Sequence, residues 1–121
     1  MLDGSKQIDR YLVMSSPEVS AVDASTIEER LAECELVLID FWAPWCAPCR
    51  ALTPQLEEIA KRYTSALRVL KVNVDTAPDL AARYGVRTIP TLILFRDGTP
   101  TSQLVGLHSQ RELSAWIQAA L

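Results

Sequence analysis

The sequence has no apolar run long enough to cross a membrane and no strong excess of charge of either sign. A membrane-spanning helix needs roughly 20 consecutive apolar residues, and no stretch of the chain approaches that length. The formal net charge at pH 7 is −3, which gives no reason to expect nucleic acid as a partner. The 121 residues, 49% of them hydrophobic, instead have the length and composition of a single globular domain.

The first residues lack the features of a secretory or organellar leader. The apolar stretch Tyr11–Met14 is four residues long, whereas a secretory signal needs an apolar region of about 7–15 residues. Asp3 and Asp9 count against an organellar transit peptide, which is typically poor in acidic residues. We therefore expect a cytoplasmic protein in which residues 1–17 form a loose N-terminal extension and residues 18–121 form the domain.

Cysteine is scarce, with three residues in the chain. An odd count does not favour a full disulfide framework, and a core of this size does not need one. Two of the three cysteines lie three positions apart in the segment Trp45-Cys46-Ala47-Pro48-Cys49. In a cytosolic chain such a pair is more often catalytic or metal-binding than structural.

Apolar patterns predict an alternation of strands and helices along the domain. The predicted strands are 19–22, 36–42, 67–74, 91–95 and 101–105, and the predicted helices are 25–34, 49–63, 78–84 and 109–121. The order βαβαβαββα indicates an α/β fold with a mixed central sheet and helices on both faces. We expect parallel inner strands joined by right-handed crossovers, closed by an antiparallel hairpin at Asp97-Gly98.

Local signals mark the ends of two helices and the position of the cysteine pair. Ser25 with Glu28, and Ser109 with Glu112, fit the capping box that opens a helix. The cysteines directly follow the strand 36–42, whose nearly continuous apolar sequence is typical of a strand covered on both faces. Sites in such sheets lie at the carboxyl ends of the inner strands, so the pair is placed where a functional site is expected.

Three sequence features carry a likeness to a known family: DFWAPWCAPC (40–49), YGVRTIPT (84–91) and Gly106. On these residues the chain resembles the thioredoxin family, and the likeness spans about residues 19–121. It implies the thioredoxin fold and a thiol–disulfide oxidoreductase, an electron carrier that reduces protein disulfides by dithiol–disulfide exchange and serves cell redox homeostasis. It departs from the family at Ala47, where most close relatives carry Gly, and at Thr88, where many carry Gly or Ser.

The resemblance also implies partners. These are client proteins that contain disulfides and an NADPH- or ferredoxin-dependent thioredoxin reductase. We expect a monomer that needs no internal cofactor and no metal, and that binds neither nucleic acid nor membrane. The alternative, from a different class of function, is a redox-independent binding or scaffold subunit that uses the apolar surface around the two cysteines.

Each cysteine has a predicted role in the exchange. Cys46 lies at the first turn of a helix, where unpaired N–H groups and the positive end of the helix dipole favour an exposed, attacking thiolate. Cys49, one turn later on the buried face, would resolve the mixed disulfide. Ala47 and Pro48 between them are predicted to tune the redox potential: Ala47 stiffens the loop relative to Gly, and Pro48 suits a first helical turn.

Asp40 is a carboxylate within a buried strand, so its pKa should be raised and it should need a partner. One interpretation is an ion pair with Lys71 of the neighbouring strand. The interpretation that the resemblance favours is that Asp40 accepts the proton of Cys49 and that Lys71 tunes it.

A docking surface is predicted to consist of Trp45, Ile89, Pro90, Val105 and Gly106. The resemblance implies that the Ile89–Pro90 bond is cis and lies against the disulfide, with nearby backbone groups free to pair with an extended client chain. The loop position of Trp45 favours docking over a place in the core. Three further aromatic residues are predicted to be core: Phe41, Trp42 and Trp116.

The sequence also permits a four-ligand zinc set of Cys34, Cys46, Cys49 and His108. At about 3.3 Å per residue, the strand between Cys34 and Cys46 separates them by more than about 20 Å, which rules the set out. We therefore expect Cys34 to be a half-buried free thiol and His108 to be solvated.

Overall fold

The computed structural model describes residues 19–121, so the prediction for residues 1–17 lies outside the described residues. The order of elements matches the predicted order over this range. In chain order they are β1 (Val19–Ala21), α2 (Ile27–Leu31), β2 (Leu36–Trp42), α3 (Ala47–Arg62), β3 (Arg68–Asn73), α4 (Pro78–Arg83), β4 (Thr91–Arg96), β5 (Thr99–Val105) and α5 (Gln110–Ala120).

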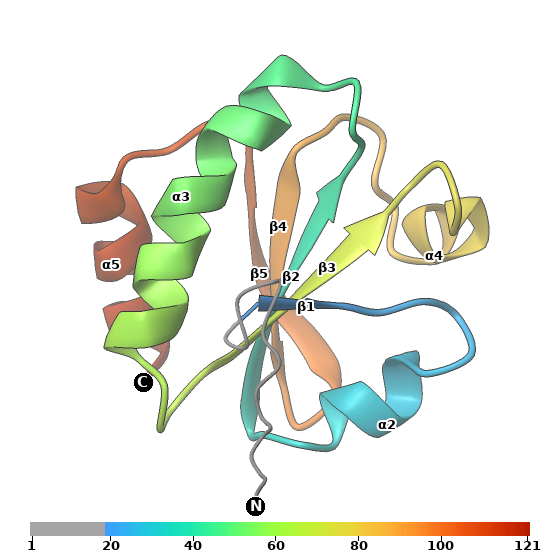
Figure 1. The fold of residues 1–121 in the computed structure, drawn as a ribbon. Helices are drawn as coiled ribbons and strands as arrows, with labels where there is room; N and C mark the ends of the chain where they lie inside the picture. The colour runs from blue at the N-terminus through green and yellow to red at the C-terminus, as the bar shows by residue number, and fades with distance from the viewer. Residues whose placement is uncertain (1–18) are drawn as a thin grey trace, which may run out of the picture.

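The described strands form one five-stranded mixed sheet with helices on both faces, as predicted (Figure 1). Its strand order is β1-β3-β2-β4-β5. Strands β1, β3 and β2 are parallel, while β4 is antiparallel to β2 and β5 is antiparallel to β4. The helices α3 and α5 pack on one face, and α2 and α4 pack on the other.

The direction of β4 corrects the expectation that every strand preceded by a helix would be parallel. The connection through the six-residue helix α4 does not carry the chain back along the sheet, since β4 runs antiparallel to β2. The chain instead enters β4 from the end of the sheet at which β3 finishes. We call this end, where β1, β2 and β3 all finish, the carboxyl end of the sheet.

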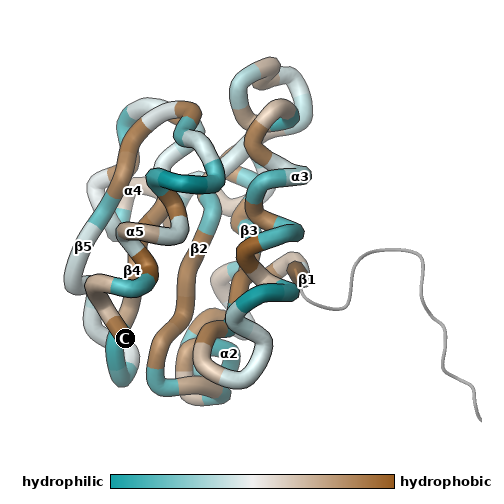
Figure 2. The backbone as a smooth tube through the Cα atoms, turned by 90° about the vertical axis from the view of Figure 1, so that its left-hand side faces the viewer, coloured by the Kyte–Doolittle hydropathy of each residue, from teal (hydrophilic) through white to brown (hydrophobic). Residues whose placement is uncertain are grey.

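Alternation along β2 divides the core into two layers. Leu36 and Leu38 pack under α3 and α5, whereas Val37, Ile39 and Phe41 pack against α2 and α4. Figure 2 shows β2 as a largely hydrophobic strand inside the molecule, while β5 at the edge is much more hydrophilic. Because side chains alternate along a strand, Asp40 points to the same face as Leu38, toward α3.

The two predicted capping boxes have different outcomes. At α5 the box is formed, because the Ser109 hydroxyl accepts from the Glu112 N–H and the Glu112 carboxylate accepts from the Ser109 N–H. At α2 the prediction is wrong: Thr26 is the N-cap residue, it makes no side-chain cap, and the helix ends at Leu31 rather than near Cys34. The carboxylate of Asp23 accepts from the Ser25 N–H and hydroxyl instead, which removes Ser25 from capping.

Candidate functional site

The cysteine pair lies at the carboxyl end of β2 and is joined by a disulfide. Cys46 is the N-cap residue of α3, and the two Cα atoms are 5.2 Å apart. The N–H of Cys49 points at the Cys46 sulfur, with a nitrogen-to-sulfur distance of 3.2 Å. A backbone donor and the helix N-terminus therefore face the sulfur of Cys46, an arrangement that favours negative charge there once the bond is reduced.

Cys46 is less accessible in the disulfide form than predicted. We expected an exposed sulfur, but the residue is only 4% exposed and Cys49 is 1% exposed. The two cysteines and Ala43 form a small apolar cluster against which Trp42, Val74 and Ile89 pack. This packing covers the sulfurs, so the expected exposure is wrong for the oxidised state.

A cis peptide bond between Ile89 and Pro90 lies beside the disulfide, as the resemblance implied. The carbonyl oxygen of Ile89 is 3.9 Å from the Cys46 sulfur. Since β4 is antiparallel to β2, the start of β4 lies at the carboxyl end of the sheet, which brings Pro90 to the cysteines. The strand direction that the sequence did not predict is thus what assembles the site.

The end of β5 reaches the same region. Val105 pairs with Thr91, and the N–H of Gly106 donates to the carbonyl of Pro90 at 2.9 Å. Gly106 has φ +92°, a left-handed conformation that suits glycine. Val105 is 51% exposed and Ile89 is half-buried. The predicted docking surface is therefore drawn from three chain segments that meet at one end of the sheet.

Trp45 is exposed and held in place by a residue that sequence reasoning missed. Its side chain is 67% exposed, and its indole N–H donates to the carboxylate of Asp75, with distances of 2.9 and 3.3 Å to the two oxygens. Asp75 follows β3, the parallel neighbour of β2. Its position just past the carboxyl end of that strand was a signal available in the sequence.

Asp40 is completely buried, and within the described part of the chain neither carboxylate oxygen has a hydrogen-bond partner. Burial raises the pKa of Asp40 from 3.8 to about 7, and the positive charge of Lys71 opposes part of that rise. The two residues are register partners on β2 and β3, yet they do not form the simple ion pair considered above. The ammonium of Lys71 instead lies over the Trp42 ring, 4.0 Å from its centroid.

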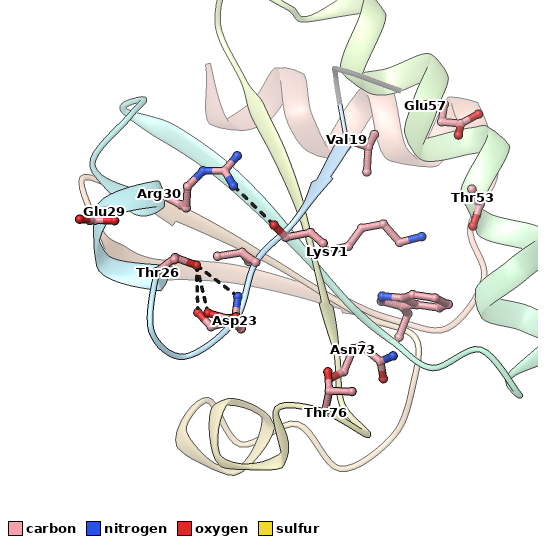
Figure 3. A pocket seen from close by; sticks show the side chains of 13 residues that line it. Val19, Asp23, Thr26, Glu29, Arg30, Thr53, Glu57, Lys71, Asn73 and Thr76 are labelled. Atoms are coloured by element: carbon pink, nitrogen blue, oxygen red, sulfur yellow. Dashed lines mark hydrogen bonds between the residues drawn. The ribbon is translucent and has the colours of Figure 1, made fainter. Parts of the chain in front are cut away.

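A cavity of about 800 Å³ reaches Lys71 from solvent between β1, α2 and α3 (Figure 3). Lys71 points into it near Thr53 and Glu57 of α3, and Trp42 also lines it. Asp40 is not among the lining residues. Solvent therefore has access to the charge that moderates Asp40 but not to Asp40 itself.

The remaining predicted residues occupy separate places. Ala47 and Pro48 form the first turn of α3, and Thr88 is exposed. Cys34 is a half-buried free thiol before β2, as predicted, and its S–H points to the Ala66 carbonyl at 3.8 Å. His108 is not freely solvated, because its side chain is 23% exposed and its ring contacts Val105 and Glu112.

The predicted core aromatics are covered to different degrees. Phe41 is fully buried, whereas Trp42 and Trp116 are half-buried against the apolar clusters. Across residues 19–121, no helix is long and apolar enough to cross a membrane, and no group of three or more candidate metal ligands occurs.

Comparison with known proteins places the chain in a family. A family model described as thioredoxin matches residues 18–119. Thioredoxin from Rickettsia bellii is 46% identical over 99 residues, covering 81% of this chain and 94% of the relative. Thioredoxin from Pseudomonas aeruginosa is 42% identical over 106 residues, covering 88% of this chain and 98% of the relative. A solved structure of a mutant thioredoxin from Halobacterium salinarum matches with a TM-score of 0.80 and 35% identity, covering 88% of this chain and 94% of that one. With its fold and its Cys46–Cys49 pair, the chain therefore belongs to the thioredoxin family and is a thiol–disulfide oxidoreductase.

Proposed function

We propose that the protein reduces disulfides in client proteins, with Cys46 as the attacking residue and Cys49 as the resolving residue. The Cys46 thiolate attacks one sulfur of the client disulfide, forms a mixed disulfide and releases the other client sulfur as a thiolate. The Cys49 thiolate then attacks the Cys46 sulfur, which closes the internal disulfide and releases the second client thiol. Two electrons pass from the cysteine pair to the client. The observation that carries this assignment is the Cys46 sulfur at the N-terminus of α3, facing the Cys49 N–H.

Asp40 is proposed to take the proton that Cys49 loses, with Lys71 moderating its charge. A pKa of about 7 leaves the carboxyl group able to both accept and release a proton near neutral pH. Both residues point toward the face of the sheet that α3 covers, the helix that bears Cys49. The cavity at Lys71 brings solvent to the ammonium group that moderates the charge of Asp40.

The docking surface is proposed to bind the client segment that carries the disulfide. Exposed apolar side chains of Trp45 and Val105 flank the backbone near cis-Pro90, the place where we expect an extended client chain to pair with this protein. Ala47 and Pro48 are proposed to set the redox potential, because they hold the first turn between the two sulfurs.

The setting proposed for this chemistry is the cytoplasm, with the protein acting there as a monomeric electron carrier. Members of the family generally act on disulfide substrates and are returned to the dithiol form by a thioredoxin reductase. Whether that reductase draws electrons from NADPH or from ferredoxin is decided by assay with each.

The test is reduction of insulin, first with dithiothreitol and then with NADPH and purified thioredoxin reductase. Cys46→Ser and Cys49→Ser should each abolish turnover, while Cys34→Ser, the matched control, should retain it. Cys49→Ser should also accumulate a mixed disulfide with the client, and Cys46→Ser should not. A scaffold subunit would keep its cellular function in the Cys46→Ser/Cys49→Ser double variant, and that outcome would overturn the proposal.

A further inference from the structure

The segment Val105–Leu107 connects β5 to the first turn of α5 and carries two exposed apolar side chains. Val105 is 51% and Leu107 is 53% exposed, and the Gly106 N–H between them is bonded to the Pro90 carbonyl. The next residue is His108, the only histidine of the chain. A single titratable ring therefore adjoins the part of the docking surface that β5 provides.

The ring of His108 lies between two hydrogen-bond acceptors. Its Nε2 is 3.1 Å from the carbonyl oxygen of Val105, and its Nδ1 is 3.4 Å from Oε1 of Glu112. A carbonyl and a carboxylate only accept, so both ring nitrogens must carry hydrogen for both contacts to be hydrogen bonds. The imidazolium satisfies this condition, whereas the neutral ring has one N–H and can make one of the two bonds.

Glu112 is the charged group that the described residues place against the ring, and β5 contributes the uncharged Val105 carbonyl. The carboxylate of Glu112 also accepts from the backbone N–H of Ser109 at 2.9 Å. Chiefly because of that bond, and with a smaller contribution from His108, the pKa of Glu112 lies below its ordinary value. Glu112 thus stays ionised while an imidazole changes charge, which in general happens between about pH 5 and 8.

We propose that His108 is a positioning residue whose protonated ring ties the Val105 carbonyl to the first turn of α5 and holds Val105–Leu107 in its client-binding conformation. The neutral ring gives up one of the two contacts, so the segment is held less firmly at high pH. This inference rests on the proposal that Val105 and Gly106 belong to the docking surface.

The first experiment follows the segment itself by NMR on the oxidised protein between pH 5 and 8.5. The amide signals of Gly106, Leu107 and Ser109 should move with the same midpoint as the C2 proton of His108. In His108→Gln, which keeps a donor but does not titrate, that transition should disappear. Recording both sets in an Asp40→Asn background separates the effect from the titration of Asp40. The proposal would be overturned if the amide transitions persisted in His108→Gln, or if the amide signals did not change with the midpoint of the His108 C2 proton.

The second experiment measures KM and kcat for a disulfide peptide at pH 6 and pH 8. The KM of His108→Gln should exceed that of the wild type about 2- to 5-fold at pH 6, the effect of losing one hydrogen bond, and should match it at pH 8. The kcat ratio should be the same at both pH values, because titration of Asp40 is common to both proteins. Val105→Ser is the reference variant and should raise KM at both pH values. If Val105→Ser leaves KM unchanged, the docking assignment is wrong and the role of His108 in client binding falls with it. If Val105→Ser raises KM while the His108→Gln ratio is equal at both pH values, the positioning role alone is wrong.

Discussion

Asp40 and Asp75 carry the same functional group and come from neighbouring parallel strands near the disulfide. Asp40 lies within β2, fully buried and without a hydrogen-bond partner among the described residues, and its pKa is raised to about 7. Asp75 lies just past β3, exposed to solvent, and accepts a hydrogen bond from Trp45. Burial turns one carboxylate into a group that exchanges protons near neutrality, while exposure leaves the other as an acceptor that orients a side chain.

The largest expected effect comes from removing the proton chemistry of Asp40. Asp40→Asn should slow the resolution of the mixed disulfide on the order of 10²-fold at pH 8, a magnitude typical of general-base catalysis. The wild-type advantage should shrink as pH falls below about 7, because the Asp40 carboxyl is then protonated and cannot accept a proton. The ratio of the wild-type rate to the Asp40→Asn rate is measured by single-turnover reduction of a client disulfide between pH 5.5 and 8.5. Equal rates of wild type and variant throughout would refute the role of Asp40 as proton acceptor.

The same substitution should stabilise the fold at high pH. The pKa of Asp40 rises from 3.8 to about 7 on folding, so ionised Asp40 is disfavoured in the native state. The free energy of unfolding is therefore highest below pH 3.8. It decreases by about 4 kcal/mol at most as the pH rises toward about 7, and it levels off above that pH. Asp40→Asn removes this loss but buries an amide without a partner, which leaves a gain of roughly 1–3 kcal/mol at pH 8.

Urea denaturation of the oxidised protein at pH 5 and pH 8 tests that gain. Asp75→Asn, the same change on an exposed carboxylate, is the matched control and should alter the free energy of unfolding by about 0.5 kcal/mol or less. A gain that is equal at the two pH values would mean that ionisation of Asp40 is not its source.

A smaller effect is expected from replacing Asp75, the exposed carboxylate. Asp75→Ala frees the Trp45 indole and should raise KM for a disulfide peptide about 2- to 5-fold, the effect of one hydrogen bond. The dependence of kcat on pH should not change, since Asp40 is untouched. Asp75→Asn keeps an acceptor and should restore most of the affinity. Steady-state kinetics on the three proteins decides whether Asp75 acts through Trp45.

The smallest effect is expected at Ala47, where neither carboxylate is altered. Ala47→Gly adds conformational freedom to the first turn of α3, worth about 0.4–1 kcal/mol. Since 30 mV corresponds to about 1.4 kcal/mol, the redox potential should change by about 10–20 mV. Equilibration against glutathione buffers measures the potential, and an unchanged value would remove Ala47 from the residues that tune it.

Several features of the fold could be read from the sequence because they depend on local patterns. Strand β2 was predicted to the residue, since its apolar run is interrupted only by Asp40 and ends before Pro44. The direction of β4 was not, because hydrophobic periodicity does not encode strand direction. The start of α2 was misplaced because the Asp23 side chain competes for the groups that Ser25 would use in a cap.

The site residues that the sequence identified were also those marked by a local pattern. Asp40 was identified because it is a single acidic residue within an otherwise apolar strand. Asp75 and His108 did not stand out, because polar residues in loops are common and their partners lie on other elements or one helical turn away. The contact of Asp75 depends on tertiary arrangement, and those of His108 depend on the conformation of the turn between β5 and α5; no sequence period records either.

The direction of α5 has a consequence for how this domain can be attached to other proteins. Val19 begins β1 level with Leu38 in the middle of the sheet, whereas α5 starts after Val105 and runs away from the cysteine end of the sheet to its last residue (Figure 1). The far end of α5 is therefore separated from the start of that helix by its eleven residues, roughly 16 Å. A second domain fused there, or a surface tether joined there, would leave the redox face pointing outward and open to large clients.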